Sequence, residues 1–350
     1  MSCETRSSVT ATSGSESFRE FRPHPLLRGG HAQTLAGAYL PWSTVASTSV
    51  QHQIALPDGD KLVLHDDCPP TWELGQRVVL LMHGLAGSHQ SGYMVRISRR
   101  LFERGIRSFR LDLRGSGAGA HLARRPYHAG CSDDLLHAIQ AMGRLCPGSS
   151  ISPIGFSLSG NILLKFLGES PGRVPPCIDR AMAVNPPIDL RGCVQELDRF
   201  SNRAYNRHFV NLLHRTLEIR RQTVPGAIIP ADYRRPRRLY DFDDRYTAPV
   251  SGFRNADEYY AQCSAAQFLP AIAVPTLILT ARDDPLVPAA SFEQSRRSDS
   301  VELLLTNSGG HLGFIARSGV DPDHRWMDWR VLDWLSTSLT DPRQLNLAAD

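Results

Sequence analysis

Residues 152–161 read SPIGFSLSGN, and this short run fixes the architecture expected for the whole chain. An apolar strand is predicted to end inside it, and a helix is predicted to begin at its end. A sharp strand-to-helix turn with a serine at its apex and small residues on both sides is typical of a nucleophile elbow. Ser157 stands at the apex, and Gly155 is one of the small neighbours. Ser159 occupies the place of the usual second glycine, and we expect the turn to tolerate its small side chain.

Short continuous apolar runs recur on both sides of this turn, and segments with helical periodicity lie between them. The predicted strands are Val78–Met82, Ser108–Leu111, Ile151–Ile154, Ala181–Val184, Thr276–Leu279 and Val301–Leu305. The predicted helices are Tyr93–Arg104, Cys131–Leu145 and Asn161–Gly168. A β-hairpin of Val50–Leu56 and Lys61–His65 is predicted to come first. This alternation indicates an α/β protein with a doubly wound, mostly parallel sheet.

One interval breaks the alternation, because residues 188–270 contain no strand-like apolar run. Such a length is too great for a plain loop, and apolar residues recur at helical spacing within it. We therefore expect a helical cap inserted into one core, and an extra helix covering the sheet edge is the alternative. The expected core is residues 23–187 and 271–340, with a disordered tail at 1–22 and a second tail at 341–350.

The composition excludes several other classes of protein. The 350 residues are 41% hydrophobic and 21% charged with a net charge of +4, which is ordinary for a globular protein and gives no nucleic-acid footprint. Seven scattered cysteines without a C-x-x-C pair predict free thiols and no metal site. No motif indicates a cofactor, and no segment reads as a signal peptide or a membrane span. We expect a soluble, cytoplasmic protein whose oligomeric state the sequence leaves open.

The two partners that a serine nucleophile needs follow in the expected chain order. A histidine must accept the serine proton, and a carboxylate must hold the histidine. Asp283 and Asp284 follow the last predicted strand but one, and His311 follows the last strand in a glycine-rich loop. The Asp-x-x-Val-Pro spacing favours Asp284 as the acid, and Asp283 stays open. Because the carboxyl ends of parallel strands meet at one edge, Ser157, Asp284 and His311 are expected to converge.

A further requirement is an oxyanion hole, since attack on an ester carbonyl develops negative charge on its oxygen. The backbone amide of Leu158, directly after the serine, is one expected donor. Leu85 is the second, because it lies in the glycine-rich run of residues 83–88 that follows a predicted strand. Asp112 and the glycines after it are expected to shape a structural turn. Seven other histidines have no acid in a site-like context and are expected to be packed or at the surface: His31, His89, His121, His128, His137, His208 and His214.

Several short motifs in a fixed order add a resemblance to this interpretation. They are Gly29-Gly30-His31-Ala32-Gln33-Thr34, His83-Gly84-Leu85-Ala86-Gly87-Ser88, Asp112-Leu113-Arg114-Gly115, Gly155-Phe156-Ser157-Leu158, Tyr240-Asp241-Phe242-Asp243-Asp244, Thr247-Ala248-Pro249, Gly252-Phe253, Tyr259-Tyr260, Asp283-Asp284-Pro285 and Gly309-Gly310-His311. With them the chain resembles the α/β-hydrolases over about residues 22–340, and more narrowly the YheT-like hydrolases. These are similar to eukaryotic α/β-hydrolase-domain proteins that act on lipid and acyl esters.

The resemblance implies serine esterase activity with Ser157 as nucleophile, Asp284 as acid and His311 as base. Ser159 departs from the family's glycine. The segment from His31 to Thr34 is expected to pack near the site in a structural role. The expected substrate is a small acyl or lipid ester, and its chain length stays open.

Two alternatives also stay open. Acyl transfer to an alcohol would use the same triad, and a non-catalytic binding protein could have the same fold. The cap adds a hypothesis about charge, because 37 of the 39 basic residues are arginine and many of them fall in this segment. The cap arginines are Arg199, Arg203, Arg207, Arg215, Arg220, Arg221, Arg234, Arg235, Arg237, Arg238 and Arg245. A solvated, partly salt-bridged face is the simpler interpretation, and weak attraction to anionic membrane surfaces or anionic acyl substrates is the sharper one.

Overall fold

A computed structural model describes residues 18–40, 49–230 and 233–337 of the chain. The described part contains one eight-stranded sheet with the order β1-β2-β4-β3-β5-β6-β7-β8. The strands are β1 Val50–Ala55, β2 Lys61–Asp67, β3 Val78–Met82, β4 Arg107–Asp112, β5 Ile151–Phe156, β6 Ala181–Val184, β7 Thr276–Ala281 and β8 Val301–Thr306. Strand β2 pairs antiparallel with both β1 and β4, and all the strand pairs from β4 to β8 are parallel. The predicted α/β fold and all of its predicted strands are confirmed.

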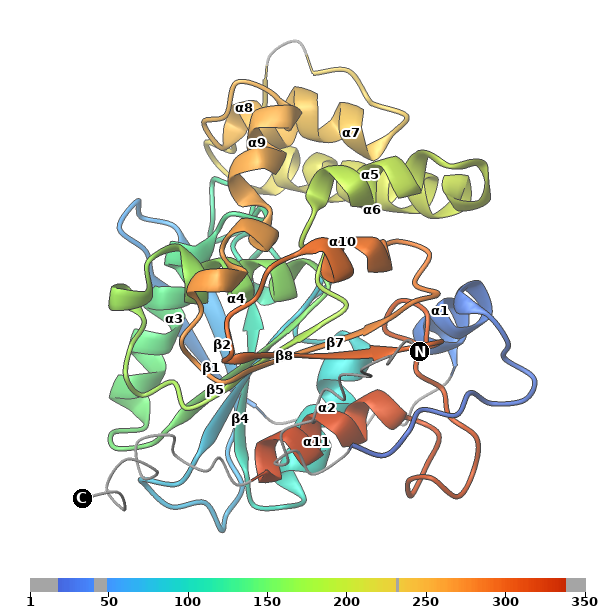
Figure 1. Cartoon of the computed structure of the whole chain (residues 1–350). Helices are drawn as coiled ribbons and strands as arrows, with labels where there is room; N and C mark the ends of the chain where they lie inside the picture. Colours follow the sequence, from blue (N-terminus) through green and yellow to red (C-terminus); the bar gives the residue numbers. More distant parts are fainter. Residues whose placement is uncertain (1–17, 41–48, 231–232, 338–350) are drawn as a thin grey trace, which may run out of the picture.

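Helices cover both faces of the sheet, as Figure 1 shows. The α-helices are α1 Gly30–Tyr39, α2 Gly92–Phe102, α3 Ser132–Leu145, α4 Leu158–Glu169, α5 Leu190–Asp198, α6 Arg203–Thr223, α7 Leu239–Phe242, α8 Ala248–Val250, α9 Ala256–Cys263, α10 Ala289–Gln294 and α11 Trp326–Ser336. Short helical turns of other types are η1 Gly117–Gly119, η2 Pro171–Arg173, η3 Phe200–Asn202, the π-helical η4 Asp243–Thr247, η5 Ala265–Gln267 and η6 Leu269–Ala271. The sequence did not predict α1, α10 or α11.

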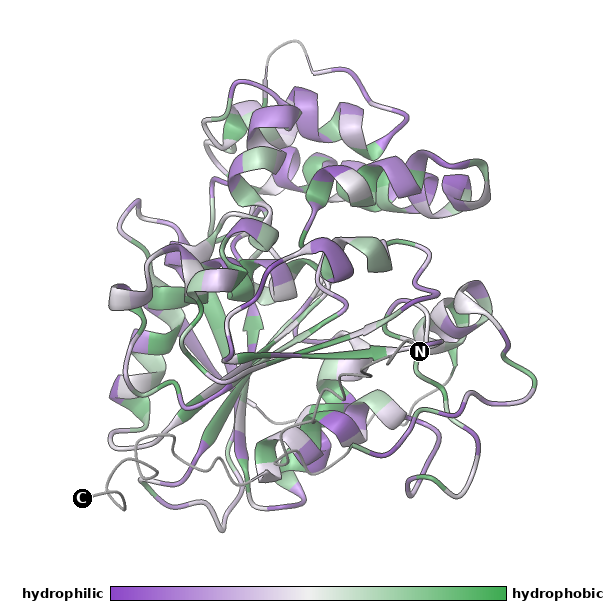
Figure 2. Cartoon of the chain, in the orientation of Figure 1, coloured by the Kyte–Doolittle hydropathy of each residue, from purple (hydrophilic) through white to green (hydrophobic). Residues whose placement is uncertain are grey.

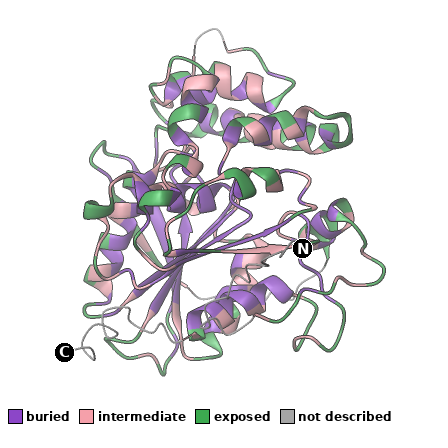
Figure 3. Cartoon of the chain, viewed as in Figure 1, coloured by how far each residue is buried: buried purple, intermediate pink, exposed green. Residues whose placement is uncertain are grey.

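Alternating strand residues build a separate core on each face of the sheet. In β3, Leu80 packs with α3 and α4, whereas Val79 and Leu81 pack with α2 and α11. The inner strands are buried on both faces, which explains their continuous apolar sequence (Figures 2 and 3). This double burial fixes the strands rigidly, so the loops at their carboxyl ends have a firm base.

The interval 188–270 is helical and contains α5 to α9. In the view of Figure 1 these helices lie together above the sheet. α6 is amphipathic, and Val210 and Leu217 are its buried apolar residues. Aromatic residues of α7 and η4 complete a small separate core here. Among the described helices, none combines the length and apolar character that crossing a bilayer requires.

Part of the expected N-terminal tail is placed. Residues 1–17 lie outside the described chain, but Phe21 is buried against Phe314 and Trp326, with ring centroids 5.6 Å and 5.3 Å away. The expected tail at 341–350 also lies outside the described residues. The six cysteines within the described part are free thiols, as predicted.

Candidate active site

Ser157 sits in a strained turn between β5 and α4. Its backbone angles, φ 52° and ψ −121°, lie in a region that non-glycine residues rarely adopt. Two features hold this turn. The Ser157 amide donates to the carbonyl of Val184 on β6 at 2.8 Å, and a methyl group at Gly155 would lie 2.4 Å from the Ser159 carbonyl oxygen. α4 therefore begins at Leu158, directly after the serine and three residues earlier than predicted.

Ser159 fits the position of the usual glycine because its side chain has a partner. It is completely buried, and its hydroxyl donates a hydrogen bond to the carbonyl of His83. This bond ties the serine turn to the loop of residues 83–88 after β3. The departure from glycine thus adds a link between two loops of the site.

His311 brings the candidate side chains together. It lies in the loop after β8, and its Nε2 is 2.9 Å from the Ser157 Oγ. Its Nδ1 is 2.8 Å from Oδ2 of Asp284, which follows β7. The Asp284 side chain is fully buried and that of His311 is 10% exposed, so this chain of hydrogen bonds is shielded from bulk water.

The two neighbouring aspartates have different surroundings. Asp284 Oδ1 accepts the amides of Leu286 and Val287 at 2.8 and 3.1 Å, which leaves Oδ2 directed at His311. Asp283 instead accepts the Gly310 amide at 2.8 Å, and burial raises the pKa of its carboxyl. Of the two open candidates, only Asp284 contacts the imidazole.

Asn185 is a site residue that the sequence analysis did not single out. It follows β6, is completely buried and has a positive φ of 45°. Its Nδ2 donates to Asp284 Oδ2 at 2.7 Å, and its Oδ1 accepts the amide of Leu312 at 3.2 Å. Asn185 thus joins the acid to the histidine loop. A polar residue directly after a buried strand, at the same sheet edge as the serine, was the available signal.

The segment from His31 to Thr34 is part of α1, which packs against the loops that carry Asp283, Asp284 and His311. A methyl group at Gly30 would lie 1.6 Å from the Asp283 carbonyl oxygen, so only glycine allows this approach. The Thr34 hydroxyl accepts the backbone amide of His311 at 2.8 Å. The Gln33 amide group spans the same gap, donating to and accepting from the backbone of Ile315. The expected location near the site is confirmed, and these contacts are structural.

The two expected oxyanion donors belong to two segments that meet at the serine, the loop after β3 and the start of α4. Gly84 lies so near that a methyl group there would be 3.0 Å from the Ser157 Cβ. The Gly84 amide donates to the Tyr93 hydroxyl, and the Ala86 amide donates to the Tyr127 hydroxyl. The Leu85 amide lies between these two amides in sequence and has no acceptor within the described residues. The same is true of the Leu158 amide.

His83 holds the peptide that contains the Leu85 amide. Burial lowers the pKa of its fully buried imidazole, which favours the neutral form. Its Nε2 accepts the Leu113 amide at 3.2 Å, so the proton is on Nδ1 and is donated to the Gly84 carbonyl at 2.8 Å. The amide of the same peptide points away from its carbonyl, and this bond therefore fixes the direction of the Leu85 N–H.

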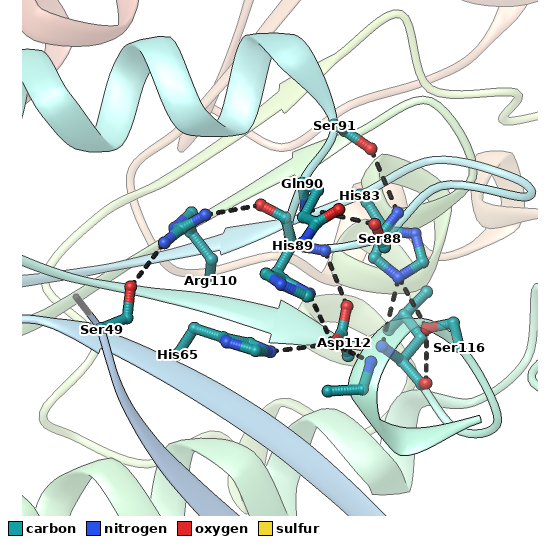
Figure 4. A network of polar contacts seen from close by, with 12 residues as sticks. Ser49, His65, His83, Ser88, His89, Gln90, Ser91, Arg110, Asp112 and Ser116 are labelled. Atoms are coloured by element: carbon teal, nitrogen blue, oxygen red, sulfur yellow. Dashed lines mark hydrogen bonds and ion pairs between the residues drawn. The ribbon is translucent and has the colours of Figure 1, made fainter. Parts of the chain in front are cut away.

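A second histidine network anchors the far end of this loop (Figure 4). Asp112 Oδ2 lies 2.9 Å from His65 Nε2 and 2.8 Å from His89 Nδ1, and Oδ1 accepts the His89 amide at 2.7 Å. The expectation that His89 has no neighbouring acid is therefore wrong, because tertiary structure brings β4 beside it. Donors from both imidazoles hold the pKa of Asp112 well below its usual range. The expected structural role of Asp112 is confirmed.

These three side chains are also the one group in the described chain with metal-ligand spacing, their ligand atoms lying within 4.8 Å of one another. The geometry does not suit an ion. The rings of His65 and His89 are stacked, with centroids 3.5 Å apart and planes 11° from parallel. Nearly parallel rings cannot both direct in-plane lone pairs at one ion about 2.0–2.1 Å away. The Asp112 carboxylate already accepts hydrogen bonds at both oxygens.

A cavity of about 550 Å³ lies between the sheet and the cap and contains Ser157 and His311 in its wall. Leucines and aromatic residues of the cap form much of the remaining wall, including Phe209, Leu213 and Phe242. A ligand in this cavity would meet the serine hydroxyl at one side and an apolar surface at the other.

A mostly parallel sheet with an antiparallel β2, and a serine turn that faces a histidine–aspartate pair, are the features of an α/β-hydrolase fold. A family model described as alpha/beta hydrolase fold matches residues 77–318. The chain is also 31% identical over 336 residues to "Putative esterase YheT" of Escherichia coli, covering 95% of this chain and 98% of that protein. The chain therefore belongs to the alpha/beta hydrolase fold family, as the resemblance of its motifs indicated.

More distant similarities agree with this family. The chain is 27% identical over 280 residues to "Monoacylglycerol lipase" of Saccharomyces cerevisiae, covering 77% of this chain and 59% of that protein. The solved Pyrococcus furiosus esterase Pf2001 has a TM-score of 0.53 and 18% identity, covering 85% of this chain and 98% of that one. At this identity the structural likeness concerns the fold alone.

Proposed function

We propose that the chain is a serine hydrolase that cleaves carboxylic esters of the acyl or lipid type. The observation that supports this most directly is the row of hydrogen bonds from Ser157 Oγ through His311 to Asp284, at 2.9 and 2.8 Å. Its position in an apolar cavity suits a substrate with an acyl chain. The names of the two relatives, "Putative esterase YheT" and "Monoacylglycerol lipase", also favour an ester as the substrate.

Each side chain has a defined task in the proposed reaction. His311 Nε2 accepts the Ser157 proton as Oγ attacks the acyl carbon, and Asp284 stabilises the imidazolium that forms. The amides of Leu85 and Leu158 donate to the oxyanion of the tetrahedral intermediate. His311 then gives the proton to the departing alcohol oxygen, which leaves an acyl-serine ester.

Water completes the cycle by the same route. His311 accepts a proton from the water as its oxygen attacks the acyl carbon, and the proton passes to Ser157 Oγ as the ester bond breaks. The carboxylic acid is released and the enzyme is restored. Because Asp284 accepts hydrogen bonds from two backbone amides and Asn185, its carboxylate keeps its orientation toward His311 through these steps.

The first test uses the Ser157→Ala variant. Without Oγ no acyl-serine forms, so we expect hydrolysis of short p-nitrophenyl esters to fall by about 10⁴-fold or more. Labelling by a fluorophosphonate, which reacts with activated serines, should also disappear. Ser152→Ala is the matched control, because Ser152 is a serine of β5 whose hydroxyl donates to Asp179 and not to His311.

Persistent labelling of the Ser157→Ala variant would contradict the assignment of the nucleophile. If the wild type released an ester of added ethanol in place of the free acid, acyl transfer would replace hydrolysis as the reaction. A chain that binds esters and cleaves none would instead be a binding protein.

A further inference from the structure

The cavity wall contains two arginines whose surroundings differ sharply. Arg114 is matched by carboxylates, with its guanidinium 2.5, 2.8 and 2.6 Å from Asp58, Asp60 and Asp134. Arg220 lies in the same wall but forms no ion pair with any carboxylate in the described ranges. The wall of the cavity beside the serine therefore contains an arginine whose charge has no counter-ion among the residues that the structure describes.

Arg220 is in the last turn of α6, and only 3% of its surface is exposed. Its Nη2 donates to the Arg124 carbonyl at 2.9 Å. Its Nε and Nη1 are buried and have no hydrogen-bond partner among the described residues. A guanidinium has five donors in a planar fork, so most of its capacity is unused.

A second polar group without a partner lies beside this arginine. The Tyr246 hydroxyl of η4 is buried and unpartnered in the described structure, and it lines the same cavity. Burial raises the pKa of Tyr246, and the positive charge of the neighbouring Arg220 opposes that rise. The hydroxyl is close enough to Arg220 to interact with it, and both residues line the same cavity.

Gly115 leaves the space that the guanidinium occupies. It has a positive φ of 70°, and a methyl group there would lie 2.3 Å from Arg220 Nη1. This glycine follows Arg114 directly, in the loop after β4. The absence of a side chain at Gly115 in the core therefore makes room for the Arg220 side chain of the cap.

A buried cation needs compensation, because removing it from water is costly. One backbone carbonyl and the C-terminal end of a helix compensate less than a carboxylate would. The acid in this cavity wall is Asp243, and it accepts the Tyr260 hydroxyl at 2.7 Å without pairing with Arg220. The residues that the structure describes do not satisfy Arg220, and we take this as the sign of an external anion.

We propose that Arg220, assisted by Tyr246, binds a negatively charged group, a carboxylate or a phosphate, carried by the ester substrate. This inference rests on the proposed esterase function and narrows its substrate class. Ser157 and Arg220 line one cavity, so the ester and the anionic group belong to one molecule with an apolar stretch between them. Arg220 is a binding residue, and the bonds made and broken at the serine stay as described.

The test compares pairs of esters in which one terminal group is either neutral or a carboxylate. 4-Nitrophenyl hexanoate is compared with the 4-nitrophenyl half-ester of adipic acid, which places a carboxylate at the end of the acyl chain. Methyl 4-hexanoyloxybenzoate is compared with 4-hexanoyloxybenzoate, which places the charge on the alcohol side. The measured quantity is the ratio of kcat/KM for the charged ester to that for the neutral ester, in the wild type and in Arg220→Met.

We expect the ratio to fall by about 10- to 100-fold in Arg220→Met for at least one of the two pairs, because a charge-assisted hydrogen bond is lost. The pair affected identifies which side of the ester carries the charge. Arg215→Met is the matched control, since Arg215 is an exposed arginine of the same helix and its loss changes the net charge equally. That control should leave the ratio unchanged.

An unchanged ratio in both pairs would overturn the proposal, because equal losses on charged and neutral esters in Arg220→Met would mean that the arginine only supports the cap. An equal fall in Arg215→Met would point to the general field of the cap and would also overturn it.

Binding of n-octyl phosphate, measured by calorimetry, separates this proposal from the esterase assignment. Ser157→Ala should bind the probe, and the double variant Ser157→Ala with Arg220→Met should bind it at least about 10-fold more weakly. Equal affinities would contradict the anion site. If the wild type hydrolysed none of the esters, the esterase assignment would fail, and the calorimetry alone would decide whether Arg220 binds anions.

Discussion

At the scale of single residues, the site depends on a few buried polar atoms, and hydrogen bonds hold each of them in one orientation. Asp284 illustrates this, because each of its oxygens accepts two hydrogen bonds. Three of the four donors only hold the carboxylate, and the fourth is the His311 imidazole. Such a preorganised acid does not need to reorient during the proposed reaction.

Asn185→Ala should lower kcat by about 10-fold with little change in KM, because Asp284 loses a donor and the Leu312 amide loses its acceptor. The measurement is steady-state hydrolysis of a p-nitrophenyl ester. The matched control is Asn206→Ala, which removes another buried asparagine, one that bonds within the cap and has no contact with the triad. If Asn206→Ala lowered kcat as strongly, Asn185 would have no special role in positioning the acid.

At the scale of elements, α1 acts as a clamp on the loops that carry Asp284 and His311. It packs through glycines, since a methyl group at Gly37 would lie 2.7 Å from the Gly313 Cα. Its hydrogen bonds to the histidine loop come from Gln33 and Thr34. The helix before the hairpin therefore supports the loop that carries His311, which lies almost the whole length of the chain further on.

Thr34→Val tests this clamp with a side chain of the same shape. It leaves the His311 amide without its acceptor, which should cost about 1–3 kcal/mol of unfolding free energy. We also expect kcat/KM to fall by about 10-fold, because the loop that carries the imidazole loses one of its supports. Denaturant unfolding and ester hydrolysis measure the two effects.

Thr34→Ser keeps the hydroxyl and should restore most of both quantities. Wild-type activity in Thr34→Val would show that α1 stabilises the fold without positioning His311.

At the scale of the whole molecule, one core supports the loops that carry Ser157, Asp284 and His311, and the cap places apolar and charged groups over them. Some of these groups are buried at a cost. Burial raises the pKa of Asp243 to about 6, and the hydroxyl of Tyr260 donates to this carboxyl. The cap therefore contains an acid that takes up a proton more readily in the folded protein than in the unfolded chain.

The stability of the protein should consequently depend on pH through Asp243. Between its ordinary pKa of 3.8 and about 6, the folded protein keeps a proton that the unfolded chain has lost. Raising the pH through this window therefore lowers the unfolding free energy, and the full cost is present above the window. Asp243→Asn should raise stability at pH 7 by up to about 3 kcal/mol and should give no gain near pH 4.

Thermal unfolding at the two pH values measures this difference. The matched control is Asp257→Asn, which removes a carboxylate from a half-exposed ion pair with Arg191. It should change stability by at most about 1 kcal/mol at either pH. A gain for Asp243→Asn that was equal at both pH values would contradict the buried-acid explanation.

The sequence by itself determined the sheet, the serine turn and the order of Ser157, Asp284 and His311. Continuous apolar runs such as Val78–Met82 are needed for strands buried on both faces, and a glycine such as Gly155 is needed where backbones almost touch. These requirements are local, so they remain legible in the linear chain. Periodicity likewise indicated the helical content of residues 188–270.

Only the tertiary structure decided which distant groups meet. α1 has no apolar stripe, and α11 is buried nearly all round, so neither shows the periodicity that identifies a surface helix. The contacts of Asn185, the His89–Asp112 contact and the buried position of Arg220 depend on the spatial order of the strands and on where the cap packs. Hydrogen bonds and ion pairs between separate elements leave no spacing in the sequence, because the distance along the chain does not set the distance in space.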